Sequence, residues 1–169
     1  MEKNKIRKII VFALFLLYAF TLLYLMFIKD RGGILSGASL GEYITEMSNF
    51  VPFRTIGGYI KALWKGTMNR SIPIRNLVGN FVLFLPLAYF VYYFKKIKMK
   101  DFMILTVVVL LVLEMLQLFT RAGAFDVDDF ILNLCGAILG YWFLSSRKER
   151  SVKESRGQPK SGALKQAIE

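Results

Sequence analysis

The sequence predicts an all-α integral membrane protein, a bundle of four transmembrane helices with a helical extracytoplasmic loop. Three observations support this fold class. The chain is 55% hydrophobic and has a mean hydropathy of +0.46, which is typical of membrane proteins. Its apolar residues form four runs that are long enough to cross a hydrocarbon core. Lysines and arginines lie beside these runs, as they do next to membrane spans.

The composition also argues against several classes of function and site. The chain has a net charge of +11, and its charged residues lie next to the apolar runs. Membrane orientation and binding of anionic lipid therefore explain this charge better than nucleic acid binding does. Without histidine, the common zinc sites and the histidine-dependent catalytic triads are nearly excluded. Cys135 is the single cysteine, so no internal disulfide can form. Any catalysis would rest on carboxylates, amides and arginine.

The first span is predicted at residues 9–28, after a basic N-terminus of residues 1–8. A signal peptide also begins with basic residues, but its apolar core is only about 7–15 residues long and ends at a small-residue cleavage site. The run here has 20 residues, and no convincing cleavage site follows it. We therefore expect a retained transmembrane helix.

The outer loop of residues 29–75 contains two helical patterns. Ser39 and Glu42 have the spacing of a capping box, and apolar residues follow them at helical spacing. The second pattern is amphipathic, with Ile56, Ile60 and Trp64 on its apolar face. Such a helix can lie in the headgroup region or pack onto the bundle as a lid, and the pattern leaves both alternatives open.

The remaining spans are predicted at residues 76–94, 102–119 and 127–144, which completes a single membrane domain of residues 9–144. Pro86 should kink the second span, a distortion that neighbouring helices can accommodate in a bilayer. Residues 120–125 should form a loop. The charged tail of residues 145–169 has no apolar period, which predicts a disordered cytoplasmic segment.

Basic residues predict the orientation. The N-terminus, the connection between the second and third spans, and the tail are all rich in lysine and arginine. Four spans place these three segments on one side, which the positive-inside rule assigns to the cytoplasm. The outer loop is also basic, but it is much longer and its charge density is lower. The sequence therefore predicts that both termini lie inside.

Polar side chains converge at the outer end of this bundle. A carboxylate, an amide and an arginine form a stripe at the end of the third span, aspartates open the fourth, and asparagines line the second and fourth. Ionisable groups in a bilayer usually mark a functional site. The candidate residues are Glu114, Gln117, Arg121, Asp126, Asp128, Asp129, Asn133, Asn76 and Asn80. The loop motif Asn49, Pro52, Phe53 and Arg54 lies on the same side.

Several interpretations of this cluster are open. Asp128 or Asp129 can cap the fourth helix, Arg121 can pair with Glu114 or an aspartate, and the asparagines can hold the bundle together. The repeat from Gly136 to Gly140 is a small-residue pattern that favours helix packing. Glu114 and the aspartates could instead hold a divalent cation, catalyse acid–base chemistry on a lipid-linked envelope precursor, or bind an amphipathic ligand without chemistry.

Four motifs in the chain resemble the VanZ-like family. They are Asn-Phe-x-Pro-Phe at 49–53, Asn-Leu-x-Gly-Asn-x-x-x-Phe-x-Pro-Leu at 76–87, Glu-x-x-Gln at 114–117 and Asp-x-Asp-Asp-x-x-x-Asn-x-x-Gly-x-x-x-Gly at 126–140. The match spans roughly residues 45–142, and the motifs occur in the family's order. Ala88 stands where the pattern has glycine, which predicts slightly different packing near Pro86.

The resemblance implies a multi-pass protein of the bacterial cytoplasmic membrane. The family's namesake is associated with low-level resistance to teicoplanin, a lipoglycopeptide that acts outside the membrane. The resemblance brings no established reaction, so it does not settle enzyme against binder, and we prefer the binder as the working interpretation. The implied partners are the lipid bilayer and a lipoglycopeptide or lipid-linked envelope precursor, and a structural partner of other envelope proteins is a further alternative.

Overall fold

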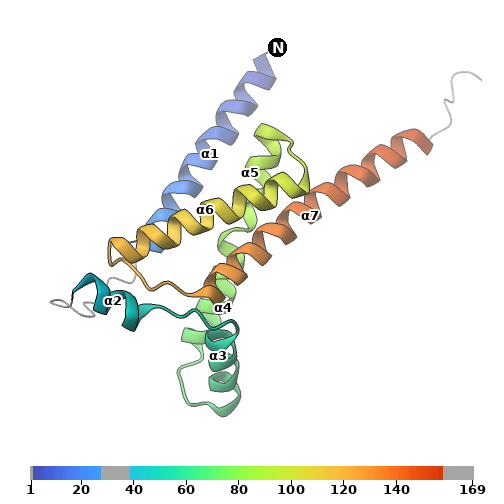
Figure 1. Ribbon diagram of the computed structural model, residues 1–169. Helices are drawn as coiled ribbons and strands as arrows, with labels where there is room; N and C mark the ends of the chain where they lie inside the picture. Colours follow the sequence, from blue (N-terminus) through green and yellow to red (C-terminus); the bar gives the residue numbers. More distant parts are fainter. Residues whose placement is uncertain (1, 28–38, 158–169) are drawn as a thin grey trace, which may run out of the picture.

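The computed structural model describes residues 2–27 and 39–157, and these are almost entirely helical (Figure 1). The helices are α1 (Glu2–Phe27), α2 (Leu40–Met47), α3 (Arg54–Lys65), α4 (Ser71–Leu83), α5 (Leu85–Lys95), α6 (Met99–Phe119) and α7 (Val127–Gly157). Four segments are long and apolar enough to cross a membrane, namely α1, α4 with α5, α6, and the first part of α7. The predicted all-α fold with four helical segments able to span a membrane is confirmed.

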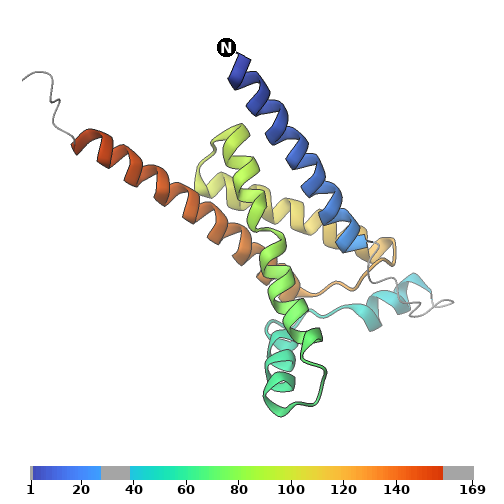
Figure 2. The same ribbon diagram turned by 180° about the vertical axis from the view of Figure 1, so that it is seen from behind.

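The two loop helices lie together at one end of the bundle. The start of α1 and the connection between α5 and α6 lie at the opposite end (Figures 1 and 2). Helix α7 packs against α4, α5 and α6, and α1 contacts α5. This arrangement brings the starts of α4 and α7 and the end of α6 to the end that carries α2 and α3.

The capping box predicted for α2 is present. The Ser39 hydroxyl accepts a hydrogen bond from the Glu42 backbone N–H, and the Glu42 carboxylate accepts one from the Ser39 N–H. The hydrogen bond from the Ser39 backbone N–H, and then one from the Ser39 side chain, lower the pKa of the Glu42 carboxyl below its ordinary value. The reciprocal pair satisfies two N–H groups that a helix N-terminus otherwise leaves free.

Two glycines let α7 approach the second span closely. A Cβ on Gly136 would lie 1.8 Å from the carbonyl oxygen of Phe81. A Cβ on Gly140 would lie 2.5 Å from the Leu85 oxygen and 3.2 Å from the Ala88 Cβ. The small-residue repeat is therefore a packing seam, and the methyl group of Ala88 fits against it because Gly140 has no side chain.

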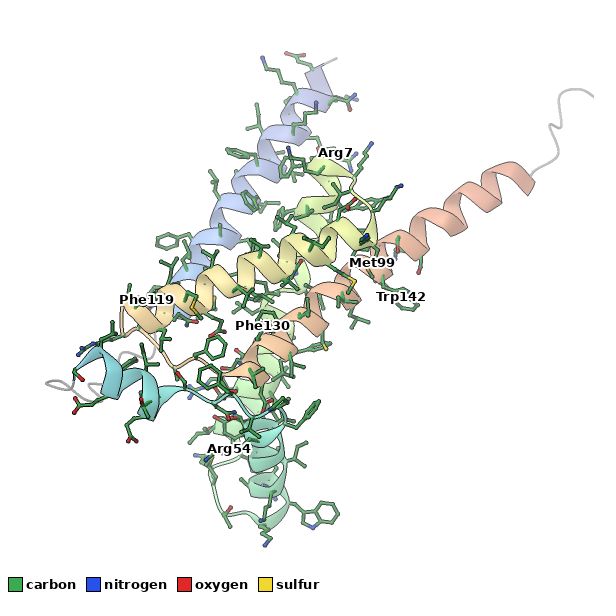
Figure 3. All side chains as sticks on the ribbon, viewed as in Figure 1. Arg7, Arg54, Met99, Phe119, Phe130 and Trp142 are labelled. Atoms are coloured by element: carbon green, nitrogen blue, oxygen red, sulfur yellow. The ribbon has the colours of Figure 1, made fainter. Side chains whose placement is uncertain are left out.

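The core lies between the second, third and fourth spans. Phe84, Ala88, Phe102 and Leu110 have no exposed surface, and Tyr141 stacks on Phe102 with ring centroids 4.8 Å apart. Outside this core the spans leave large apolar side chains exposed, such as Trp142, which points away from the helices (Figure 3). An apolar exterior of this kind is suited to lipid contact.

The second span breaks at Phe84, one residue before α5 begins. Pro86 lies in the first turn of α5, where its missing N–H costs nothing. The Tyr18 hydroxyl of α1 donates a 3.0 Å hydrogen bond to the Leu83 carbonyl at this break. The second span is thus interrupted next to Pro86 as predicted, and α1 supplies a hydrogen bond to one carbonyl at the break.

Several helix boundaries differ from the predicted spans. Helix α4 begins at Ser71 instead of residue 76, because Pro73 is tolerated in a first turn and the Asn69 side chain accepts the Ser71 N–H at 3.0 Å. Helix α7 continues to Gly157, past the predicted end at residue 144, because no glycine or proline interrupts that stretch. Residues 28–38, predicted to belong mostly to the outer loop, and residues 158–169, predicted to belong to the tail, lie outside the described residues.

Candidate functional site

A polar cavity lies at the end of the bundle that carries the loop helices. Its volume is about 550 Å³. Residues from α1, α2, α3, α4, α6, α7 and the loop before α7 line it. The predicted residues among them are Asn76, Asn80, Glu114, Gln117, Asp126, Asp129 and Asn133. The structure therefore brings seven of the nine candidates for the pocket to one cavity, and Arg121 and Asp128 lie outside its lining.

The loop motif is clamped to the start of α7 by backbone hydrogen bonds. The Asn49 N–H donates to the Phe125 carbonyl at 2.7 Å, and the Val127 N–H donates to the Asn49 carbonyl at 3.0 Å. These bonds form an isolated parallel bridge between Asn49 and Asp126. Two segments that are far apart in the sequence are thereby fixed side by side over the cavity.

The Asp126 side chain completes this clamp. Its Oδ1 accepts hydrogen bonds from the Asn49 side-chain amide at 3.0 Å and from the Asp128 N–H at 2.9 Å. Its Oδ2 accepts the Thr55 hydroxyl at 2.6 Å. Asp126 therefore caps the fourth span, a role for which the sequence had suggested Asp128 or Asp129 instead.

Asp128 caps a different helix from the one it belongs to. Its carboxylate is completely buried and accepts the backbone N–H groups of Phe53, Thr55 and Ile56 at the start of α3. Phe53 has a left-handed φ of 64°, which aims these N–H groups toward α7, and it makes no side-chain cap of its own. The negative charge also complements the positive end of the α3 dipole. Asp128 thus docks α3 on the bundle.

Two deeply buried side chains in the cavity have free acceptor atoms. Glu114 and Asn133 are each only 2% exposed. Within the described part of the chain, Glu114 Oε2 and Asn133 Oδ1 have no hydrogen-bond partner. A buried acceptor without a partner carries a desolvation cost of about 1–3 kcal/mol. These atoms are the positions where a ligand's hydrogen-bond donors would be most favourable.

The other amides of the cavity are engaged with the bundle. The Gln117 side chain donates a 2.8 Å hydrogen bond to the Met26 carbonyl at the end of α1. The Asn76 side chain donates to the Ile72 carbonyl of its own helix at 2.9 Å. The Asn80 amide lies beside the Asp129 carboxylate and links α4 to α7. These contacts hold the wall of the cavity in place.

The Arg121 side chain does not line the cavity. Arg121 has a left-handed φ of 53°, is exposed, and places its guanidinium 5.7 Å from the Tyr43 ring centroid. The Tyr43 hydroxyl in turn donates a 2.8 Å hydrogen bond to the Gly123 carbonyl. Arg121 therefore joins α2 to the loop before α7.

Pro52, Phe53 and Arg54 of the loop motif have exposed side chains at the start of α3. Figure 3 shows Arg54 at this end of the bundle, beside the start of α7. The cavity lining of the described residues includes none of the three. Within the motif it is Asn49 that reaches the aspartates.

The sequence reasoning missed several lining residues. Arg75, Thr55 and Tyr59 line the cavity, together with apolar residues that include Met26 and Leu83. Partial burial raises the pKa of Tyr59, and the charges of Asp129 and then Asp126 raise it further. Arg75 directly precedes Asn76, the first residue of the Asn-Leu motif. This adjacency to a predicted site residue was the signal that could have placed Arg75 at the cavity.

A metal centre has little support from this geometry. Within the described residues, no group of three or more histidine, cysteine, aspartate or glutamate side chains has a spacing suited to a metal ion. The oxygens of Asp126 and Asp128 are already occupied by hydrogen bonds from Asn49, Thr55 and the α3 backbone. The carboxylates left for a ligand are Glu114 and Asp129.

The fold and the cavity define a class of protein, a multi-pass α-helical membrane protein with a polar cavity at one end of its bundle. The model of the VanZ/LLP1 family matches residues 15–148. The chain belongs to this family, and the match runs from within α1 to just beyond the fourth span. No curated protein and no solved structure matches the chain.

Proposed function

We propose that this VanZ/LLP1 protein lies in the bacterial cytoplasmic membrane with its cavity facing outward. There it binds an amphipathic envelope ligand and contributes to low-level resistance to teicoplanin and related lipoglycopeptides. The resistance role comes from the family's namesake. The binding role comes from the chemistry of the cavity.

The binding role is supported chiefly by the state of the Glu114 side chain. Its carboxylate is almost fully buried at the cavity wall, and its Oε2 has no hydrogen-bond partner in the described chain. Structural carboxylates elsewhere in this protein are satisfied, as the hydrogen bonds of Asp126 and Asp128 illustrate. A buried carboxylate oxygen left without such a partner is costly in a membrane protein and supports a ligand site.

The outward orientation is supported by the distribution of basic residues. The end of the bundle opposite the cavity carries the lysines and arginine of the N-terminus and the lysines of the α5–α6 connection. The positive-inside rule assigns that end to the cytoplasm. The cavity then opens toward the side where a lipoglycopeptide acts.

A second function is favoured by one feature of the same cavity. Glu114 and Asp129 both line it, and two carboxylates in different surroundings can serve as acid and base. This pair supports a membrane enzyme that acts on a lipid-linked envelope precursor. Turnover of such a precursor by purified protein, abolished by either Glu114→Gln or Asp129→Asn, would favour this alternative over the binder.

The proposed role is tested by the teicoplanin susceptibility of a host that expresses the protein. Wild type should raise the inhibitory concentration above that of the empty host, and Glu114→Gln should return it to that level. Glu46→Gln, the same substitution at an exposed position on α2, is the matched control and should behave as wild type. The three proteins must be present at equal levels in the membrane. Equal susceptibility of the wild-type and empty hosts would refute the resistance role.

A further inference from the structure

We propose that the cavity binds the headgroup of an aminophospholipid. In this assignment Glu114 and Asp129 hold the ammonium group, and Arg75 holds the phosphate. The inference rests on the proposed binding function and names the chemical class of its ligand.

The free polar atoms of the cavity are both acceptors. Glu114 Oε2 and Asn133 Oδ1 are both hydrogen-bond acceptors, and both lack a partner among the described residues. They therefore select a ligand that donates hydrogen bonds. A primary ammonium group carries three N–H donors and no acceptor, which matches this pair of atoms better than a group that both donates and accepts.

Acidic side chains outnumber basic ones in the lining of the cavity. The lining contains the carboxylates of Glu114, Asp126 and Asp129, against the guanidinium of Arg75. Since Asp126 is occupied by Asn49, Thr55 and the Asp128 N–H, its charge is largely compensated. Glu114 and Asp129 remain to attract a cation. A headgroup that is only anionic would meet these carboxylates and be repelled, and a neutral sugar would leave them uncompensated.

Arg75 places a cationic side chain at the same cavity. It lies in the first turns of α4 and lines the same cavity as the carboxylates. Guanidinium groups recognise phosphate through paired hydrogen bonds. A ligand with an ammonium group at one end and a phosphate a short distance away can therefore satisfy both charge types of the lining at once.

Part of the cavity wall is apolar. Leu25 and Met26 from the end of α1 and Leu83 from α4 line the cavity beside the polar groups. These residues belong to segments able to span a membrane, so this part of the wall is suited to contact with hydrocarbon. A free amino alcohol phosphate would leave these side chains uncovered, whereas the chains of a lipid would pack on them.

The test is lipid selectivity of the full chain purified in detergent. Phosphatidylethanolamine should raise the unfolding temperature and remain bound in native mass spectrometry. Phosphatidylglycerol, which has no ammonium group, should do neither. Phosphatidylcholine keeps the positive charge but has no N–H donors, and it should bind about tenfold more weakly because charged hydrogen bonds are lost. Equal binding of phosphatidylglycerol and phosphatidylethanolamine would overturn the inference.

Variants locate the binding. Glu114→Gln and Asp129→Asn should each weaken phosphatidylethanolamine binding about tenfold or more. Glu46→Gln and Asp101→Asn make the same changes at exposed positions and should leave it unchanged. If the pocket variants bind phosphatidylethanolamine as tightly as these controls, the inference fails. The comparison of lipids on wild type remains decisive even if one pocket variant does not fold.

Three further outcomes separate the possibilities. If soluble phosphoethanolamine competes as well as the lipid does, the ligand is water-soluble and the lipid assignment is overturned. If the lipid selectivity is absent but Glu114→Gln still abolishes teicoplanin resistance, the headgroup inference fails and the proposed function stands. If the selectivity is present but resistance is unaffected by Glu114→Gln, the resistance role fails and the headgroup inference stands.

Discussion

Replacing Asp128 with asparagine should release the start of α3 from the bundle. The carboxylate accepts the N–H of Phe53 through Oδ1, and those of Thr55 and Ile56 through Oδ2 at 2.7 and 3.0 Å. Asparagine has a single oxygen, so its NH₂ group must face at least one backbone N–H. Hydrogen bonds to a charged group contribute about 1.5–3 kcal/mol each. The expected loss is about 3 kcal/mol, which is roughly a 150-fold shift in the docking equilibrium of α3.

Hydrogen exchange measures this shift directly. The amides of Phe53, Thr55 and Ile56 should exchange roughly a hundredfold faster in Asp128→Asn, because exchange through local opening follows the docking equilibrium. Asp101→Asn makes the same change at an exposed carboxylate of α6 and should leave these amides as they are in wild type. If the two variants show the same exchange at these amides, the Asp128 carboxylate does not hold α3, and the account of the docked loop is wrong.

Three further changes test other parts of the structure. Gly136→Ala should destabilise the protein by about 3 kcal/mol or more in a detergent unfolding titration, since the new Cβ overlaps a carbonyl of the second span, whereas Gly58→Ala meets open space and should be neutral or slightly stabilising. Tyr18→Phe should cost about 1 kcal/mol in the same titration, because it removes the hydroxyl that satisfies the carbonyl at the helix break. Asp129→Asn should lower the pKa of Tyr59, because the Asp129 charge helps to raise it. A tyrosinate absorbance titration, with Tyr59→Phe to assign the signal, checks this. Since the folded-state pKa lies above the ordinary value of about 10, Tyr59 contributes stability below that pH, and the contribution is lost as the pH rises through the folded pKa.

Hydrophobic run length and helical spacing predicted most of this fold. The four spans, the capping box at Ser39, the amphipathic helix and the kink at Pro86 all depend on neighbours within a few residues of each other. Local rules therefore suffice for them. The convergence of polar groups also followed from the number of spans, because each pass through the membrane returns the chain to a fixed side. The early start of α4 was missed although Pro73 carried the signal.

The partners of individual side chains could not be predicted in the same way. Asp126 and Asp128 are two residues apart, yet one caps its own helix and the other caps α3. Sequence spacing says nothing about which distant backbone will lie opposite. Arg121 was expected to face the carboxylates, but its left-handed backbone turns it to Tyr43 instead. The distinction between satisfied and free carboxylates depends on these long-range contacts.

The contact of Asp128 with the start of α3 also bears on how the protein is made. Helix α3 leaves the ribosome long before Asp128 does, since 72 residues separate Ile56 from Asp128. Until the fourth span is inserted, the N-terminal amides of α3 have no carboxylate to receive them, and the Asn49 bridge has no second strand. The cavity is thus closed last, by the arrival of the C-terminal helix. A nascent chain truncated before residue 126 should insert its first three spans and yet leave α3 open to protease, so protection of α3 would report the completion of biogenesis.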